Sequence, residues 1–293
     1  FTAQTRADGS LTVAGQGTAA IGAVRRLYNH PILAQISGSA PWRANASVRG
    51  GVTDLSVDSS LQGVAINLPQ PFTKAAGELL PLRIERTNGS DPEMLRRFRG
   101  LHPPTGGDVL SVTLGAAENR TSSALLVRRA EGKALVVERG VVALNVPVTT
   151  PVQPGIMLTG AVDYADMDRW QALLGDKSGG ASNTANAASA YPLDGLRGVN
   201  LRIGMLDVAG KRLNSLALRA VPRASQWIVT VDAREAKGEI QWRPGVVQAR
   251  LSRLVTPEDR PAVPGAPERE VLSELPALDV IAEDFVHRGK QLG

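Results

Sequence analysis

Apolar and polar residues alternate along most of the chain, the pattern of a β-strand with one dry and one wet face. Residues 51–74 show it most clearly. The apolar positions of Leu55–Leu61 share one parity, Gly63 interrupts the count, and Val64–Leu68 resumes it before two prolines, which lack a backbone N–H, end the ladder. The pattern predicts a strand, a kink, a second strand and a stop, and the same unit recurs to the end of the chain.

Alternation predicts further strands along the whole sequence. We expect them at 46–49, 81–86, 110–114, 156–162 and 278–286, as a hairpin at 125–129 and 134–142, and as a five-strand meander within 199–251. Residues 135–137 are apolar on both faces, which predicts a strand covered on both sides. Residues 92–108 give no clear pattern.

The period changes to a helical one in two places. Apolar residues recur at helical spacing near 19–28 and in 165–174, and both segments are short. The second has acidic residues at its start and a glycine beyond its end, as helices commonly do. We therefore expect two short helices that cover only part of a sheet.

The predicted fold is mostly β: a long twisted, curled antiparallel sheet that forms an apolar groove, with a filled β-sandwich as the alternative. With roughly 14 to 18 strands about 4.8 Å apart, such a sheet runs on the order of 65 to 85 Å. Alternation is the same in both folds, but aromatic residues are only 4% of the chain, which leaves few bulky side chains to fill a sandwich. The expected organisation is a β-groove segment at 1–175 with its helices, a flexible loop at 176–190, a β-meander at 191–254 continuing the groove, a Pro/charge-rich loop at 255–275 and the start of a next β segment at 276–293.

Four separated motifs carry a resemblance to a known family. They are Leu-x-Val-x-Ser-x-Leu-x-Gly with Leu-Pro-x-Pro-x-x-Lys within 55–74, and the segments 36–42, 238–242 and 275–293. In their order along the chain, these motifs resemble those of the AsmA-like family of bacterial envelope proteins, in its YhdP branch. The resemblance implies a long periplasmic protein of repeated β-groove modules that carries phospholipid between the inner and outer membranes, with no catalytic residues. It also implies that this chain is a fragment of the periplasmic region, with the full-length protein anchored in the inner membrane and reaching toward the outer one.

The dry-face positions are the candidate site. We expect the groove to be lined by Leu55, Val57, Leu61, Val64, Ile66, Leu110, Val112, Leu114, Leu201, Ile203, Met205, Leu216, Leu218, Val229, Val231, Val247 and Leu251. Phospholipid acyl chains are the expected partner, with membrane contact through other parts of the full-length protein and other envelope proteins as further partners. No cofactor, metal, nucleic acid or catalytic activity is expected.

Composition and motifs disfavour other functions. The formal charge of +5 is dispersed, there are no cysteines, and no run of about 18 apolar residues occurs. His30, His102 and His287 lie far apart, and neither a nucleophile elbow nor a P-loop is present. Residues 15–20 imitate a dinucleotide-binding turn, but the acidic residue required about 20 positions later is missing, so we interpret the glycines as an ordinary turn.

Two other functions stay open. A filled β core would make the chain a structural or scaffold module of the envelope. Four tryptophans could form a sugar-binding platform, which would make the chain a carbohydrate or peptidoglycan binder. They are spread over separate predicted elements, which favours packing in the core or at the rim: Trp42, Trp170, Trp227 and Trp242.

Overall fold

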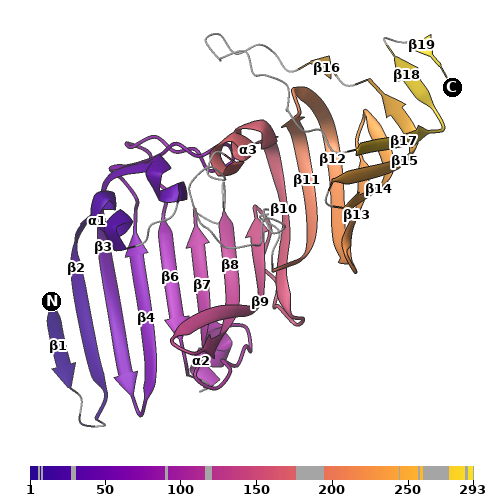
Figure 1. Cartoon of the computed structure of the whole chain (residues 1–293). Helices are drawn as coiled ribbons and strands as arrows, with labels where there is room; N and C mark the ends of the chain where they lie inside the picture. Colours follow the sequence, from indigo (N-terminus) through magenta and orange to yellow (C-terminus); the bar gives the residue numbers. More distant parts are fainter. Residues whose placement is uncertain are drawn as a thin grey trace, which may run out of the picture. The chain divides into compact units, whose positions relative to one another are not determined.

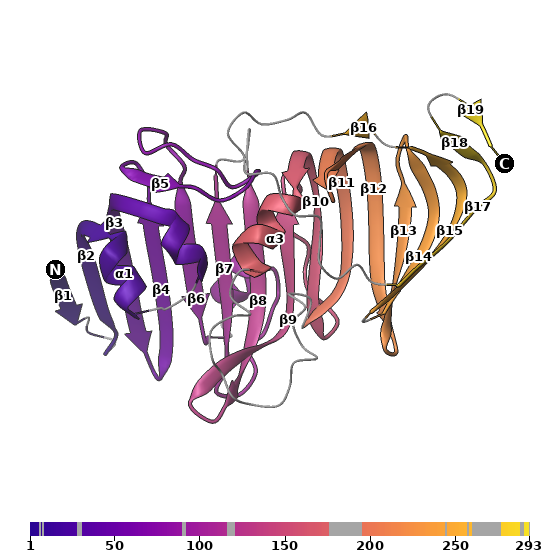
Figure 2. The same ribbon diagram turned by 45° about the horizontal axis from the view of Figure 1, so that its top comes forward.

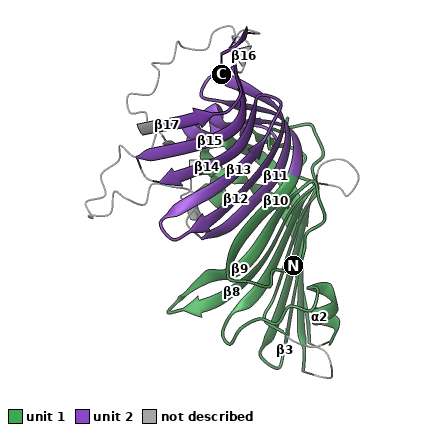
Figure 3. Cartoon of the chain, turned by 90° about the vertical axis from the view of Figure 1, so that its right-hand side faces the viewer, with its two compact units in different colours: residues 1–68, 72–160 green, residues 69–71, 161–293 purple. Residues whose placement is uncertain are grey.

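The computed structural model describes residues 1–5, 7, 9–27, 31–89, 92–115, 121–175, 195–243, 245–256, 258–259, 277–287 and 290–292. These residues form two compact units, shown in green and purple in Figure 3. Unit 1 holds residues 1–68 and 72–160, and unit 2 holds residues 69–71 and 161–293. The predicted loop at 176–190 and most of the one at 255–275 lie outside the described residues, as does His30.

Unit 1 is built on one sheet. Its strands pair in the order β1, β2, β3, β4, β6, β7, β8, β9, β10, antiparallel except for β9 with β10, which are parallel. Figure 1 shows these strands side by side. Their bounds are β1 Thr2–Thr5, β2 Leu11–Ala20, β3 Ile36–Arg49, β4 Val52–Ser59, β6 Leu82–Thr87, β7 Asp108–Leu114, β8 Ser122–Glu131, β9 Ala134–Leu144 and β10 Gly155–Asp166.

Short elements sit at the ends of these strands. The helix α1 (Ile21–Leu27) packs on β2 and β3, and the 3-10 helix η1 (Pro31–Gln35) leads into β3. The short strand β5 (Val64–Ile66) pairs with the first three residues of β3. The helix α2 (Pro92–Arg97) lies at the opposite ends of the strands, beside β7 and β8 (Figure 1).

Unit 2 contains the predicted meander. The helix α3 is followed by β11 to β15, each antiparallel to the next (Figure 2), and β15 then pairs in parallel with β17 and β18. The bounds are α3 Met167–Gly175, β11 Leu196–Val208, β12 Lys211–Arg223, β13 Gln226–Asp232, β14 Ala236–Arg243, β15 Val246–Val255, β16 Glu258–Asp259, β17 Ala277–Ala282, β18 Phe285–His287 and β19 Lys290–Gln291.

The mostly β fold with short helices is confirmed, with differences in detail. The parallel pairs make the sheet mixed, whereas we expected antiparallel pairing throughout. Residues 15–17 do not turn: they lie inside β2, which pairs with β3 over ten residues. Both glycines lie against aromatic rings: a Cβ on Gly15 would lie 2.6 Å from the ring of Phe1, which would have to move, and a Cβ on Gly17 would touch the ring of Trp42 at 3.4 Å.

Candidate functional site

One row of aliphatic residues and glycine crosses the sheet of unit 1 from β2 to β10. Each residue of the row is the backbone partner of the next, and partners directly opposite in a β-ladder project from the same face of the sheet. We call this set the middle row, and the face that carries it the apolar face of unit 1. The middle row consists of Gly15, Ala44, Val57, Ile84, Val112, Ala124, Val142 and Leu158.

Two flanking rows, two residues away along each strand, extend the same face. They contain the predicted residues Leu55, Leu110 and Leu114. Trp42 belongs to one of them, beside Gly17, and Arg86 to the other, opposite Leu110. The apolar face therefore contains at least three neighbouring rows, two residues apart along each strand.

The middle row is not covered. All of its residues are half-buried and none is buried, whereas the inner face of a packed sandwich is buried by the facing sheet. The described residues of unit 1 thus form an open sheet, and the filled sandwich that we kept as an alternative is not what they form.

The opposite face of unit 1 is polar and tied down by ion pairs. Arg83 donates to Asp58 over 3.1 Å and to Glu85 over 3.0 Å, and Arg97 of α2 donates to Glu85 over 2.7 Å. Burial alone raises the pKa of the Glu85 carboxyl, but the hydrogen bonds from Arg83 and Arg97 outweigh it, so the pKa lies below its ordinary value of 4.5. These contacts fasten α2 to the polar face.

A small packed core also lies on that polar side. Phe98, just after α2, and Leu101 pack against the buried side chains Val109, Leu125 and Val127 of β7 and β8. These three strand residues have the parity opposite to the middle row. Covering in unit 1 is therefore concentrated on the face that the candidate residues do not use.

Unit 2 repeats the amphipathic arrangement on its meander. Two apolar rows cross β11 to β17 on one face of the sheet. The row that lies between them along the strands projects from the opposite face; it is polar and exposed, starts at Asn200 and Arg219, and ends at Arg250 on β15. The apolar rows are Leu201, Leu218, Val231, Gly238, Leu251 and Ala282, and Val199, Ala220, Val229, Ile240, Ala249 and Val280.

The predicted residues of unit 2 share this apolar face but differ in exposure. Those that stay half-buried are Leu201, Met205, Leu218, Val229 and Val247, while Ile203, Leu216, Val231 and Leu251 are buried.

Three predicted residues lie apart from the others. Val64 and Ile66 are only 1% and 7% exposed, in β5, where they pair with the start of β3. Leu61 occupies the turn before β5, with a φ of 50°. These side chains pack at the end of unit 1 and are not brought together with the middle row.

Sequence reasoning missed several members of the apolar face. Ile84, Val142 and Leu158 were not among the candidates, although each lies in a predicted strand with apolar residues of its own parity, and Leu126 was missed as well. The parity was visible, but the pairing register that joins the strands into rows was not.

One concave feature of unit 1 adjoins a flanking row of the apolar face. A hollow of about 850 Å³ in unit 1 is lined by the polar-face residues Arg43, Asp58 and Arg83 together with Trp42 and Leu82. None of the described residues that line this hollow belongs to the middle row, so the hollow does not mark the site. Among the described residues no group of three or more His, Asp or Glu side chains is arranged to hold a metal ion. None of the described helices has the length and hydropathy needed to cross a membrane.

The fold and the candidate site of unit 1 are those of a protein with an apolar binding surface on an open β-sheet. A sheet with one apolar face that no second layer covers is typical of proteins that bind apolar partners, because contiguous apolar surface is unfavourable in water. The comparison with family models then identifies the particular family: the model of the YhdP protein family matches residues 1–293, and the chain belongs to that family.

A curated relative adds a function at the level of the family. The chain is 24% identical, over 215 residues, to the intermembrane phospholipid transporter YhdP of Escherichia coli strain K12. The match covers 71% of this chain but 15% of the relative, so the chain spans a small part of that protein's length. No solved structure matches the chain.

Proposed function

We propose that this chain conducts phospholipid, with acyl chains lying against the apolar faces of units 1 and 2, as part of a longer periplasmic protein that bridges the inner and outer membranes. The observation that carries the proposal is the middle row, an unbroken line of aliphatic residues and glycine that is left half-exposed. In this function the chain supports the lipid balance and barrier of the outer membrane without catalysing a reaction.

The dimensions of the middle row suit an acyl chain. Eight residues on neighbouring strands about 4.8 Å apart span on the order of 34 Å. The hydrocarbon core of a whole bilayer is about 30 Å thick, so one acyl chain needs about half the row. Each CH₂ group that leaves water contributes about 0.8 kcal/mol, and smooth aliphatic side chains impose no fixed position on the chain. Such a surface holds lipid while letting it slide.

The relative supports the same proposal. Its printed function is intermembrane phospholipid transport, and the family match extends over the whole of this chain. The polar faces of both units carry charged side chains such as Arg83 and Arg250, as expected of surfaces that stay in water.

Lipid content tests the proposal directly. The chain is purified from bacteria without detergent, and its organic extract is analysed by mass spectrometry. We expect phospholipid at a reproducible ratio to protein, and less of it in Val112→Asp, which places a charge in the middle row. Thr113→Asp is the matched control, because Thr113 is the next residue of β7 and lies on the polar face opposite Arg83.

Two outcomes would contradict the proposal. An extract without phospholipid from a folded chain would favour the scaffold function. Equal lipid in the Val112→Asp and Thr113→Asp variants, both with the circular dichroism of the parent chain, would show that lipid binds elsewhere.

A further inference from the structure

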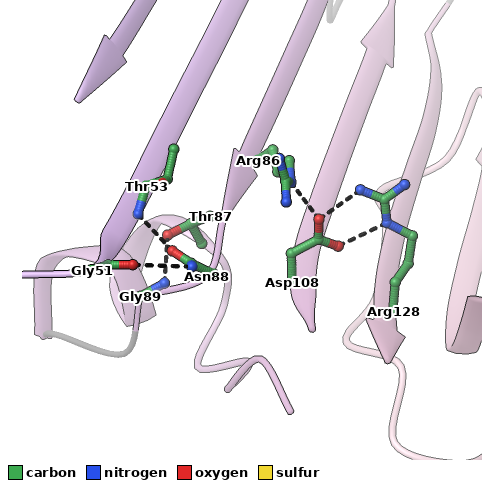
Figure 4. A network of polar contacts seen from close by, with 8 residues as sticks. All are labelled: Gly51, Thr53, Arg86, Thr87, Asn88, Gly89, Asp108 and Arg128. Atoms are coloured by element: carbon green, nitrogen blue, oxygen red, sulfur yellow. Dashed lines mark hydrogen bonds and ion pairs between the residues drawn. The ribbon is translucent and has the colours of Figure 1, made fainter. Parts of the chain in front are cut away.

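A charged cluster interrupts the apolar face of unit 1 near one end of its strands. The Asp108 carboxylate is completely buried between Arg86 and Arg128 (Figure 4). Arg128 donates through Nε to Oδ1 and through Nη2 to Oδ2, each over 2.7 Å, and Arg86 donates through Nε to Oδ2. The register places Asp108 opposite Arg128 and Arg86 opposite Leu110, so all three side chains share the face of the middle row.

The cluster contains two positive charges, on Arg86 and Arg128, and one negative charge, on Asp108. The two-bond contact with Arg128 already compensates the buried carboxylate of Asp108, whose burial would be costly if it were unpaired. Arg86 then adds a second guanidinium, so the three side chains together carry one net positive charge on the apolar face.

The outer donors of the cluster are left available. Within the described residues we find no hydrogen-bond partner for Nη1 or Nη2 of Arg86 or for Nη1 of Arg128. The side chain of Arg86 is 40% exposed and that of Arg128 is 21% exposed, so both side chains are partly open to solvent. Asp108 thus holds two guanidinium groups in place, and each keeps donors that Asp108 does not use.

The neighbouring backbone is also held in place. Asn88, which follows β6, accepts from the N–H of Thr53 over 2.6 Å and donates to the carbonyl of Gly51 over 3.3 Å (Figure 4). The N–H of Gly89 donates to the hydroxyl of Thr87 over 3.0 Å. Since these bonds tie the end of β6 to the start of β4, Arg86 projects from a constrained backbone.

We propose that Arg86 and Arg128 bind the phosphodiester of a phospholipid whose acyl chains lie on the adjacent middle row. Guanidinium groups match the geometry of phosphate oxygens and form charge-assisted hydrogen bonds with them. Arg86 and Ile84 are two residues apart on one strand, about 7 Å, which is a short step from a phosphate to its acyl chains. This proposal rests on the proposed function and adds the position along unit 1 at which a lipid headgroup binds.

The test separates headgroup recognition from acyl-chain binding. Two lipids with identical short, chain-brominated acyl groups are titrated into the full chain: phosphatidylglycerol, and diacylglycerol, which lacks the phosphate. Binding is followed by bromine quenching of Trp42 in a Trp170→Phe, Trp227→Phe, Trp242→Phe background, because Trp42 lies on the apolar face of unit 1.

We expect phosphatidylglycerol to bind about tenfold more tightly than diacylglycerol. In Arg86→Gln this preference should be lost while diacylglycerol binding is unchanged, since Asp108 keeps both bonds to Arg128. Arg83→Gln is the matched control: it removes the same charge from the same strand on the polar face and should keep the preference.

Each result decides between the proposals. An unchanged preference in Arg86→Gln overturns the phosphate site and leaves lipid conduction standing. Absence of quenching by either lipid in the parent background overturns both proposals. Displacement of phosphatidylglycerol by millimolar inorganic phosphate alone would show a site for the free ion, which also overturns the lipid assignment.

Discussion

At the scale of single residues, parity could be predicted and exposure could not. The sequence places Val57 and Val112 on the dry side of their strands, and both lie in the middle row. The same reasoning selected Val64, which is buried in β5 because the chain folds back onto the start of β3 after Gly63. The buried carboxylate of Asp108 gave no signal at all, because its partners are 20 and 22 positions away along the chain.

Glu85 makes unit 1 sensitive to acid. Its pKa in the folded protein lies below the ordinary 4.5, so its ion pairs stabilise the fold fully above about pH 4.5. This stabilisation is lost as the pH falls through the folded-state pKa, where the carboxyl becomes protonated. We expect Glu85→Gln to lower the free energy of unfolding by about 1 kcal/mol at pH 7, since both partner arginines are substantially exposed.

Urea denaturation at pH 7 and pH 3 measures this effect. The difference between the parent chain and Glu85→Gln should shrink at pH 3, because the stabilisation from this carboxylate decreases below its ordinary pKa of 4.5. Glu131→Gln is the control, because its pair with Arg129 is largely exposed and should contribute little at either pH. A difference of the same size at both pH values would show that the charge of Glu85 is not its source.

At the scale of elements, long strands were predictable and short irregular pieces were not. The meander from β11 to β15 follows directly from alternation, because each strand is long and its turns are short. The helix α2 has six residues, too few for a helical period to show. Residues 135–137 mislead in the other direction: their apolar run predicts a strand covered on both sides, yet Leu135 is 36% exposed and Val137 is 38% exposed.

The segment around α2 should contribute to the stability of unit 1 without contributing to lipid binding on the apolar face. Phe98 is 2% exposed in the small core on the polar side, so we expect Phe98→Ala to lower the free energy of unfolding by about 3 kcal/mol or more. Lipid bound per folded chain should stay unchanged, because the middle row lies on the other face. Urea denaturation with lipid mass spectrometry checks both parts, with the exposed Arg99→Ala as control. Loss of lipid from folded Phe98→Ala would contradict the separation of the two faces.

At the scale of the whole chain, the open face is the feature that alternation alone leaves undetermined. A sandwich and an open sheet require the same dry positions, and they differ only in whether a second layer follows. The scarcity of aromatic residues favoured the open sheet, and the half-exposed middle row of unit 1 agrees with it. Unit 2 also carries an apolar face, on which some residues are half-buried and others buried, and this leads to a prediction about how much lipid each unit holds.

We expect units 1 and 2 to hold lipid independently in the isolated chain. Val112→Asp and Val229→Asp should each lower the phospholipid per chain by about half, and the double variant should abolish it, because the two substitutions place a charge on different apolar faces. Val229 is the better target in unit 2 because it is half-buried, whereas an aspartate at the buried Ile203 would also disturb packing. Thr230→Asp is the control, since Thr230 is exposed on the polar face of the same strand. Complete loss of lipid from either single variant, with its circular dichroism intact, would contradict independent lipid binding by the two units.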